Sequence, residues 1–307
     1  MDDPTHGMNP GPIAVFDSGL GGLSVVQHLR QLLPHETIVY FGDTARIPYG
    51  TKTRRTIAQF ALECAEFLLR FEPKLVVAAC NTASALALDE LERELPVPCI
   101  GVVEPGARAA VQLAGGRPIA VIGTEATIGS DAYRKAIRTL APEQPVLAKA
   151  CPLFVPLVEE GRTADDPLVR LAIWDYLAPL REQEPAVLVL GCTHYPLLRE
   201  AISAYLGPSV AIVDSGRETS LAVQRHLARQ AGVAMAGAAA GGALPCAGAG
   251  GGGARLSAGA PTGTLRCYVS DNPPRFRQIG ERFLHERIGH VEVVEAEQYV
   301  GLRPAKL

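Results

Sequence analysis

Two of the seven cysteines, Cys80 and Cys192, stand where an apolar run gives way to polar residues and a helical pattern. The chain reads LVVAACNTASAL around the first and LVLGCTHYPLL around the second. We expect each cysteine to follow a strand and to lie at a helix N-terminus, where the helix dipole lowers the pKa of a thiol. A thiol of ordinary pKa, about 8.5, then needs only a small shift to act as a general base near neutral pH.

Two such thiols on opposite sides of one bound molecule would suit inversion of configuration at carbon. A thiolate on one face removes a proton, and a thiol on the other face delivers one. A cysteine hydrolase would instead pair one thiol with a histidine and would leave the second thiol without a role. Backbone N–H groups at the two helix starts could hold a carboxylate of the substrate. The pattern therefore favours acid–base catalysis at carbon.

The other five cysteines lack this setting. An odd number of scattered cysteines is no disulfide framework in a reducing compartment, and no C-x-x-C pair suggests a zinc site. We expect no metal. Four of the five are predicted to be small buried hydrophobes, and the fifth lies in an Ala/Gly-rich run. These are Cys64, Cys99, Cys151 and Cys267 in the core, and Cys246 in the run.

Short apolar runs alternate with longer helix-period stretches from Ile13 onward. Examples are IAVF before LSVVQHLRQLL, KLVVAA before a helix that continues through Glu94, and AVLVLG before PLLREAISAYL. Strands that are apolar throughout, each followed by an amphipathic helix, indicate parallel strands covered on both faces. The predicted fold class is therefore α/β.

The strand-and-turn pattern repeats within the chain. Cys80 stands 63 residues after Asp17 (80 − 17), and Cys192 stands 68 residues after Thr124 (192 − 124). The near-equal spacing predicts two related α/β halves. Open parallel sheets bind ligands beyond the carboxyl ends of their strands, so we expect two pseudo-symmetric parallel-sheet domains with the active site in the cleft between them.

Six motifs, in order, closely resemble those of the cofactor-independent glutamate racemases, members of the aspartate/glutamate racemase superfamily. They are FDSGLGG, GDTARIPYG, AACNTASA, IGTEATIGS, FVPLVEEG and LGCTHYPLL. The resemblance covers roughly residues 13–230 and resumes at RCYVSDNPPRF. It implies the two-domain fold, interconversion of L-glutamate and D-glutamate without a cofactor, supply of D-glutamate for peptidoglycan, and a homodimer.

The resemblance also implies a role for each matching residue. Cys80 would act on D-glutamate and Cys192 on L-glutamate, with Asp17 near the first thiol and with His194 and Glu159 assisting the second. The substrate's amino and carboxylate groups would be bound by Asp17, Ser18, Tyr49, Gly50, Asn81, Thr82, Thr124, Thr127, Thr193 and His194. Without pyridoxal phosphate as an electron sink, backbone donors and the exclusion of water would have to stabilise the carbanion.

Several other interpretations remain open at this point. GLGG at 19–22, with Asp43 after the next strand, resembles part of a dinucleotide fingerprint, but the third glycine position holds Ser24. A tight turn that exposes Asp17 is the better account of these glycines, and Asp43 is expected to cap or fix the TARIPYG loop. His194 beside Cys192 could instead bind a metal or activate a nucleophile, although residues so placed usually diverge.

Two rival functions also remain. One is a racemase of the same superfamily that acts on aspartate or a hydantoin, because the shape of the pocket decides the length of side chain accepted. The other is a non-catalytic two-domain amino-acid receptor of periplasmic type. Retention of both thiols and the missing signal peptide argue against the receptor.

The composition of the chain limits the partners and the location that we expect. A net charge of -3 over 307 residues offers no basic surface for nucleic acid, and MDDPTHGMNPGP contains no apolar signal region, so we expect a cytoplasmic protein. The Ala/Gly-rich run has too few large side chains to span a membrane and is predicted to be a flexible linker.

The expected division of the chain has three parts. They are an extension at 1–12, a first domain at 13–104 plus 219–307 that contains a linker at 232–263, and a second domain at 105–218.

Overall fold

The computed structural model describes residues 11–230 and 263–301. The predicted linker at 232–263 lies outside the described residues except for Gly263, and so do Cys246 and residues 1–10 of the predicted extension. Among the described residues, no helix has both the length and the apolar character needed to cross a membrane.

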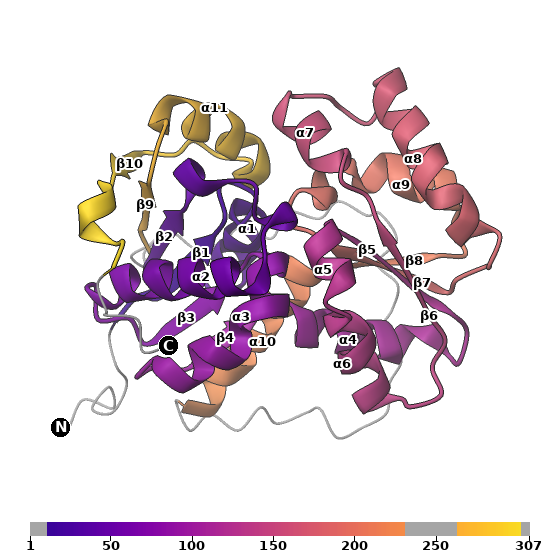
Figure 1. The fold of residues 1–307 in the computed structure, drawn as a ribbon, viewed down its shortest axis with the longest axis horizontal. Coiled ribbons are helices and arrows are strands. Elements are labelled where there is room, and N and C mark those ends of the chain that lie inside the picture. Colours follow the sequence, from indigo (N-terminus) through magenta and orange to yellow (C-terminus); the bar gives the residue numbers. More distant parts are fainter. Residues whose placement is uncertain (1–10, 231–262, 302–307) are drawn as a thin grey trace, which may run out of the picture.

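The described chain forms two parallel sheets, one on each side of Figure 1. The larger sheet has the order β10-β9-β2-β1-β3-β4, and the smaller has the order β6-β5-β7-β8. All paired strands are parallel. The strands are β1 (Ile13–Asp17), β2 (Ile38–Gly42), β3 (Leu75–Ala78), β4 (Cys99–Gly101), β5 (Ile119–Gly123), β6 (Val146–Ala150), β7 (Val187–Gly191), β8 (Ala211–Asp214), β9 (Leu265–Val269) and β10 (His290–Val293).

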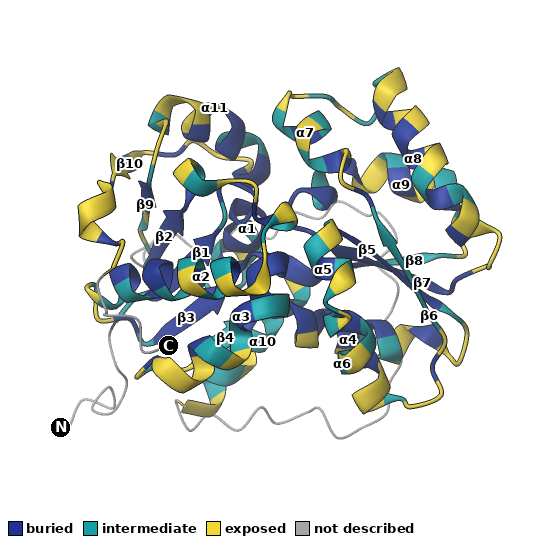
Figure 2. Cartoon of the chain, in the orientation of Figure 1, coloured by how far each residue is buried: buried dark blue, intermediate teal, exposed yellow. Residues whose placement is uncertain are grey.

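Helices cover both sheets, as expected for strands that are apolar along their whole length. Every residue of β1, β2, β5 and β7 is buried, and the exposed residues gather on the outer faces of the helices (Figure 2). The helices are α1 (Leu23–Leu32), α2 (Arg54–Leu69), α3 (Asn81–Glu94), α4 (Val103–Ala114), α5 (Glu125–Gly129), α6 (Ala132–Leu140), α7 (Phe154–Glu159), α8 (Pro167–Arg181), α9 (Arg199–Leu206), α10 (Ser215–Gln230) and α11 (Pro273–Leu284). Four 3₁₀ turns complete the described elements: η1 (Thr44–Arg46), η2 (Tyr49–Thr51), η3 (Tyr195–Leu198) and η4 (Ala296–Gln298).

The internal repeat predicted from sequence is present in the sheets. The order β2-β1-β3-β4 of the larger sheet is matched by β6-β5-β7-β8 in the smaller one, so β1 corresponds to β5 and β3 to β7. Cys80 follows β3 and Cys192 follows β7, at equivalent places in the two halves. The predicted α/β class with two pseudo-symmetric parallel sheets is confirmed.

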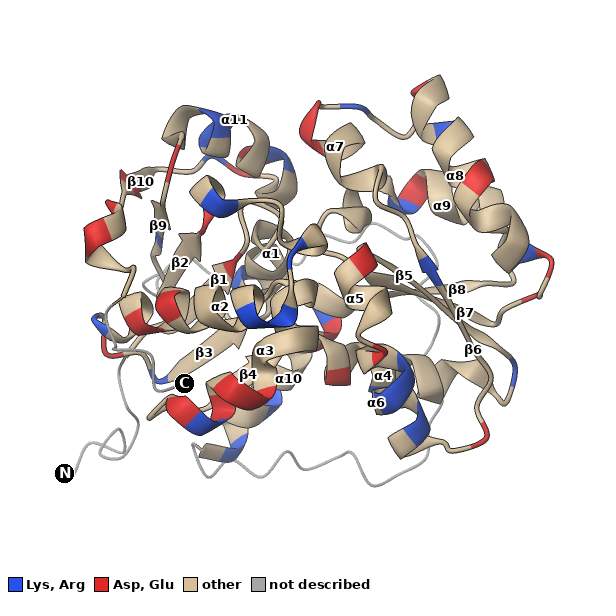
Figure 3. Ribbon diagram, in the orientation of Figure 1, with Lys and Arg blue, Asp and Glu red and all other residues tan. Residues whose placement is uncertain are grey.

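The chain crosses between the sheets twice, through α4 and through α10. The proposed division at 104/105 and 218/219 puts one sheet in each part, with both boundaries inside these helices. Because α10 packs against both α1 and α4, it ties the two halves together. Along α2 the basic residues lie at the start, at Arg54 and Arg55, and the acidic residues lie in the second half, at Glu63 and Glu66 (Figure 3).

Candidate active site

A cavity of about 350 Å³ lies between the two halves, beyond the carboxyl ends of β1, β3, β5 and β7. Both halves of the chain contribute to its wall, and both Cys80 and Cys192 line it. Of the thirteen site residues predicted from sequence, eleven line this cavity: Ser18, Tyr49, Gly50, Cys80, Asn81, Thr82, Thr124, Glu159, Cys192, Thr193 and His194. The other two, Asp17 and Thr127, are buried behind its wall.

Cys80 occupies the N-cap position of α3, as predicted, and only 5% of its surface is exposed. Its thiol is hydrogen-bonded by Ser18 and by the backbone N–H of Ala83. The predicted lowering of its pKa is nevertheless wrong. Burial, together with the negative charge of Asp17, raises the pKa of Cys80 to about 12, because desolvation of the thiolate outweighs the helix terminus. Cys80 is therefore a protonated thiol near neutral pH.

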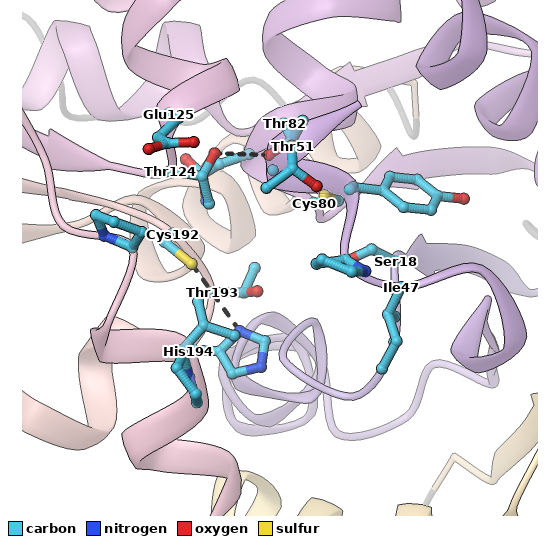
Figure 4. Close-up of a pocket in the computed structure, with 18 of the residues that line it drawn as sticks. Ser18, Ile47, Thr51, Cys80, Thr82, Thr124, Glu125, Cys192, Thr193 and His194 are labelled. Atoms are coloured by element: carbon cyan, nitrogen blue, oxygen red, sulfur yellow. Dashed lines mark hydrogen bonds between the residues drawn. The ribbon is translucent and has the colours of Figure 1, made fainter. Parts of the chain in front are cut away.

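Cys192 does not lie at the N-terminus of an α-helix, contrary to the prediction. A turn and η3 follow it, and α9 begins only at Arg199. What stands beside the thiol is His194, whose Nδ1 is 3.9 Å from the sulfur (Figure 4). The expectation that these two side chains diverge is thus also wrong, because the turn brings residues two apart onto the same side.

His194 connects Cys192 to Glu159. Its Nε2 lies 3.1 Å from Oε1 of Glu159 at the end of α7, and the imidazole is almost fully buried. Burial disfavours the charged ring, but the hydrogen bonds and negative charge of Cys192 and Glu159 outweigh it and raise the pKa of His194 to about 10. Burial likewise opposes ionisation of Glu159, yet His194 and the Arg275 guanidinium lower its pKa. The cationic His194 thus lies between the sulfur of Cys192 and the carboxylate of Glu159 beside the cavity.

Asp17 ends β1 and is fully buried, so the predicted exposure of this residue is wrong. Its carboxylate accepts the Gly19 N–H at 2.9 Å and lies 3.5 Å from the Thr193 hydroxyl, which donates to it. Burial raises the pKa of Asp17, although the charge of His194 opposes the shift. The carboxylate thus acts electrostatically on Cys80 and His194 from behind the cavity wall.

The glycine turn before α1 permits this close approach of the two halves. A Cβ built on Gly21 would lie 2.3 Å from Oγ1 of Thr193 and 2.6 Å from Nδ1 of His194, and one on Gly22 would lie 2.6 Å from Cβ of Asp17. Gly21 therefore allows packing against the Cys192 turn, whereas Gly22 allows packing against Asp17 in the same half.

Gly21→Ala should displace Thr193 and His194 and lower kcat/KM by about tenfold or more, because a shift of about 1 Å in a catalytic group is costly. Gly129→Ala is a matched control, since a Cβ there would meet no atom within 4 Å. The comparison requires steady-state rates and melting temperatures for both variants. Equal activity of the two variants would show that the turn does not set the geometry of His194.

The loop over 43–51 covers the cavity from the side of the larger sheet. Asp43 fixes it, as expected: its carboxylate accepts hydrogen bonds from Arg46, from the Tyr49 hydroxyl at 2.5 Å and from Ser270 at 3.1 Å. The Tyr49 hydroxyl is therefore committed to Asp43, which leaves the ring and backbone to form the wall. Gly50 packs on Thr124 of the other half, where an added Cβ would lie 2.8 Å from the threonine Cβ.

Three threonine hydroxyls meet across the two halves. Thr82 on α3 lies 3.0 Å from Thr124 and 3.2 Å from Thr127, and Thr124 and Thr127 are 2.9 Å apart. Thr124 also caps α5 by accepting the N–H of Thr127. Thr82 and Thr124 face the cavity, whereas Thr127 supports them.

Sequence reasoning missed several residues of the wall. The apolar ones carry no chemical signature, and only their place beside the PYG and PLVEEG motifs could have revealed them. Glu125 directly follows Thr124 and could have been found by extending that motif. The missed residues are Gly19, Ile47, Pro48, Thr51, Glu125, Pro152, Val155 and Pro156. Over 11–230 and 263–301, no three His, Cys, Asp or Glu side chains converge as a set that could hold a metal ion.

Comparison with known proteins agrees with this site. Residues 22–223 match the family model of the Asp/Glu/hydantoin racemases. Glutamate racemase from Geobacter metallireducens is 44% identical over 288 residues, which are 93% of this chain and 97% of that protein.

Solved structures give the same result. Glutamate racemase from Francisella tularensis, solved with D-glutamate, aligns with a TM-score of 0.80 and 35% identity over 95% of this chain and 100% of that one. The enzyme from Thermus thermophilus, solved with β-chloro-D-alanine, aligns with a TM-score of 0.76 and 43% identity over the same shares. The chain therefore belongs to the Asp/Glu/hydantoin racemase family and, within it, to the glutamate racemases.

Proposed function

We propose that this protein interconverts L-glutamate and D-glutamate without a cofactor, by a two-base proton transfer at Cα between Cys80 and Cys192. The observation that carries the proposal is the placement of the two thiols. They follow equivalent strands of two pseudo-symmetric halves and line one cavity of about 350 Å³. A volume in this range suits a small ligand.

The two thiols have different charged neighbours. Cys80 is a thiol, because its pKa is raised to about 12. The raised pKa of His194, about 10, keeps an imidazolium 3.9 Å from the sulfur of Cys192. The protonated Cys80 is thus set to give a proton, and on the family resemblance Cys192 takes one from L-glutamate in the direction that forms D-glutamate.

In this direction the Cα–H bond breaks as the Cys192 thiolate takes the proton. The Cys80 S–H bond then breaks as its proton passes to the opposite face of Cα. The turnover leaves Cys192 protonated and Cys80 as thiolate, which is the state required for the reverse direction. No electron is gained or lost, so the step needs only acids and bases.

The carbanion must be stabilised by groups that are already oriented. The candidates are the imidazolium of His194 and the backbone N–H groups at the start of α3. In a site shielded from water such donors stabilise developing charge more strongly than they would in solution. Asn81, Thr82, Thr124 and Gly50 complete the proposed contacts with the amino and carboxylate groups.

Glutamate is preferred over aspartate because the relatives that match nearly the whole chain are named glutamate racemases, one of them solved with D-glutamate. The test is incubation of the protein with each enantiomer of glutamate and of aspartate in D2O, followed by NMR of the α-proton and chiral chromatography. We expect exchange and inversion with glutamate. Exchange confined to aspartate would replace the glutamate assignment, and binding without exchange would favour a receptor.

The proposed setting rests on the family resemblance. D-glutamate made by the enzyme would supply peptidoglycan synthesis in the cytoplasm, and the active form would be a homodimer. Light scattering with and without glutamate measures the oligomeric state.

A further inference from the structure

Tyr133 on α6 lies between the two cysteine segments, and its side chain is buried. Its hydroxyl donates to Oδ1 of Asn81 at 2.7 Å, and Asn81 directly follows Cys80. Its ring lies against Gly191, which directly precedes Cys192: a Cβ built on Gly191 would lie 3.2 Å from Cε2 of Tyr133. One side chain therefore contacts a neighbour of each cysteine.

The side-chain amide of Asn81 is held at its other end as well. Its Nδ2 donates to Oγ of Ser215 at 3.5 Å, and this hydroxyl donates to the carbonyl of Leu190 at 3.0 Å. Leu190 belongs to β7 and stands two residues before Cys192. A row of hydrogen bonds thus runs from the residue after Cys80 to the strand that carries Cys192.

The hydrogen bond from Tyr133 to Asn81 is the shortest of this row, at 2.7 Å. Asn81 is 2% exposed, so water has little access to replace a lost donor at its carbonyl oxygen. A buried acceptor deprived of its partner moves or recruits another donor. Removal of the Tyr133 hydroxyl would therefore first change the structure at the start of α3, where Cys80 lies.

We propose that Tyr133 is a positioning residue that fixes the placement of the two thiols relative to each other through Asn81 and Gly191. The inference rests on the proposed two-base function. When the carbanion has formed, the thiol that took the proton can return it, which retains configuration, or the opposite thiol can deliver one, which inverts it. The balance between these outcomes depends on how well both thiols are aligned on Cα.

The test is Tyr133→Phe in D2O, starting from each glutamate enantiomer in turn. At early conversion, deuterium in the recovered starting enantiomer measures exchange with retention, and deuterium in the opposite enantiomer measures inversion. We expect kcat to fall about tenfold and the ratio of retention to inversion to rise at least about threefold. A merely structural role would reduce the amount of folded enzyme and leave this ratio unchanged, and that result would overturn the inference.

Tyr268→Phe is the matched control. Tyr268 is a buried tyrosine on β9 that does not line the cavity, and its ring packs against the rings of Phe67 and Phe71. It should keep the wild-type ratio. Ser215→Ala loosens the other end of Asn81 and should raise the ratio in the same direction, so it tests the inference even if Tyr133→Phe folds poorly. An unchanged ratio in Ser215→Ala would count against the inference.

A double-mutant cycle tests the route through Asn81. If Tyr133 acts through this residue, adding Tyr133→Phe to Asn81→Ala should lower the rate no further. If the two substitutions instead lower the rate by independent factors that multiply in the double variant, Tyr133 does not act through Asn81. Failure of the wild-type protein to racemise glutamate would instead refute the proposed function, whereas normal racemisation with an unchanged ratio in the variants would refute only the role of Tyr133.

Discussion

Cys80→Ala and Cys192→Ala should each lower the rate of glutamate racemisation by about 10²–10⁴-fold, the usual contribution of a positioned general acid or base. Each variant retains one thiol on one face of the substrate. Inversion needs a proton taken from one face and another delivered to the opposite face, so neither variant can complete it by the normal route. Chiral chromatography of the product gives the rate in both directions.

The two directions must lose the same factor in kcat/KM. L-glutamate and D-glutamate have equal free energies in water, so the equilibrium constant is one and no variant can change it. The difference between the cysteines must therefore be sought in exchange with solvent. On the family resemblance, Cys80→Ala should retain slow α-proton exchange only with L-glutamate, and Cys192→Ala only with D-glutamate.

Cys99→Ala is the matched control for these variants, since Cys99 is a partly buried cysteine on β4 that does not line the cavity. It should keep nearly wild-type activity. Near-wild-type inversion by either Cys80→Ala or Cys192→Ala would refute the two-base mechanism. Exchange with the two enantiomers reversed would show that the assignment of faces is wrong, and exchange of the same enantiomer by both variants would show that the thiols do not act on opposite faces.

The sequence predicted the features that depend on local pattern. Apolar strands followed by amphipathic helices gave the α/β class, and the spacing of Asp17, Cys80, Thr124 and Cys192 predicted the equivalence of the two sheets. These predictions succeeded because a strand buried on both faces must be apolar along its whole length. The ends of such strands then meet at one edge of each sheet.

The sequence did not predict the electrostatics. A helix N-terminus alone suggests a lowered thiol pKa, but Cys80 is buried beside Asp17, and burial depends on residues distant in the chain. The contact between His194 and Cys192 depends on a turn rather than a helix. The commitment of the Tyr49 hydroxyl to Asp43 likewise depends on how one loop folds back. Only the three-dimensional structure therefore shows which residues line the cavity and which residues determine its charge.

Glu159→Gln should lower kcat/KM by about tenfold to a hundredfold and should move the alkaline limb of the pH profile to lower pH. Glu159 and Cys192 raise the pKa of His194 to about 10, above its ordinary value of 6.5. The imidazolium therefore persists in the wild type until the pH approaches 10. Glutamine keeps the shape of the side chain but removes the negative charge, so the ring of the variant should lose its proton at lower pH.

The measurement is kcat/KM from pH 6 to pH 10.5 for the wild type, for Glu159→Gln and for Glu160→Gln. Glu160 is the adjacent residue, is exposed and lies 3.5 Å from Arg162, so its variant controls for the loss of one negative charge near the end of α7. The alkaline limb should move only in Glu159→Gln. If the alkaline limb does not move in Glu159→Gln, the group that titrates there is a thiol and not His194. A shift of equal size in both variants would show that the loss of any negative charge near α7 is sufficient. A shift confined to Glu159→Gln would mean that Glu159 sets the charge on His194 and that the reaction depends on this charge.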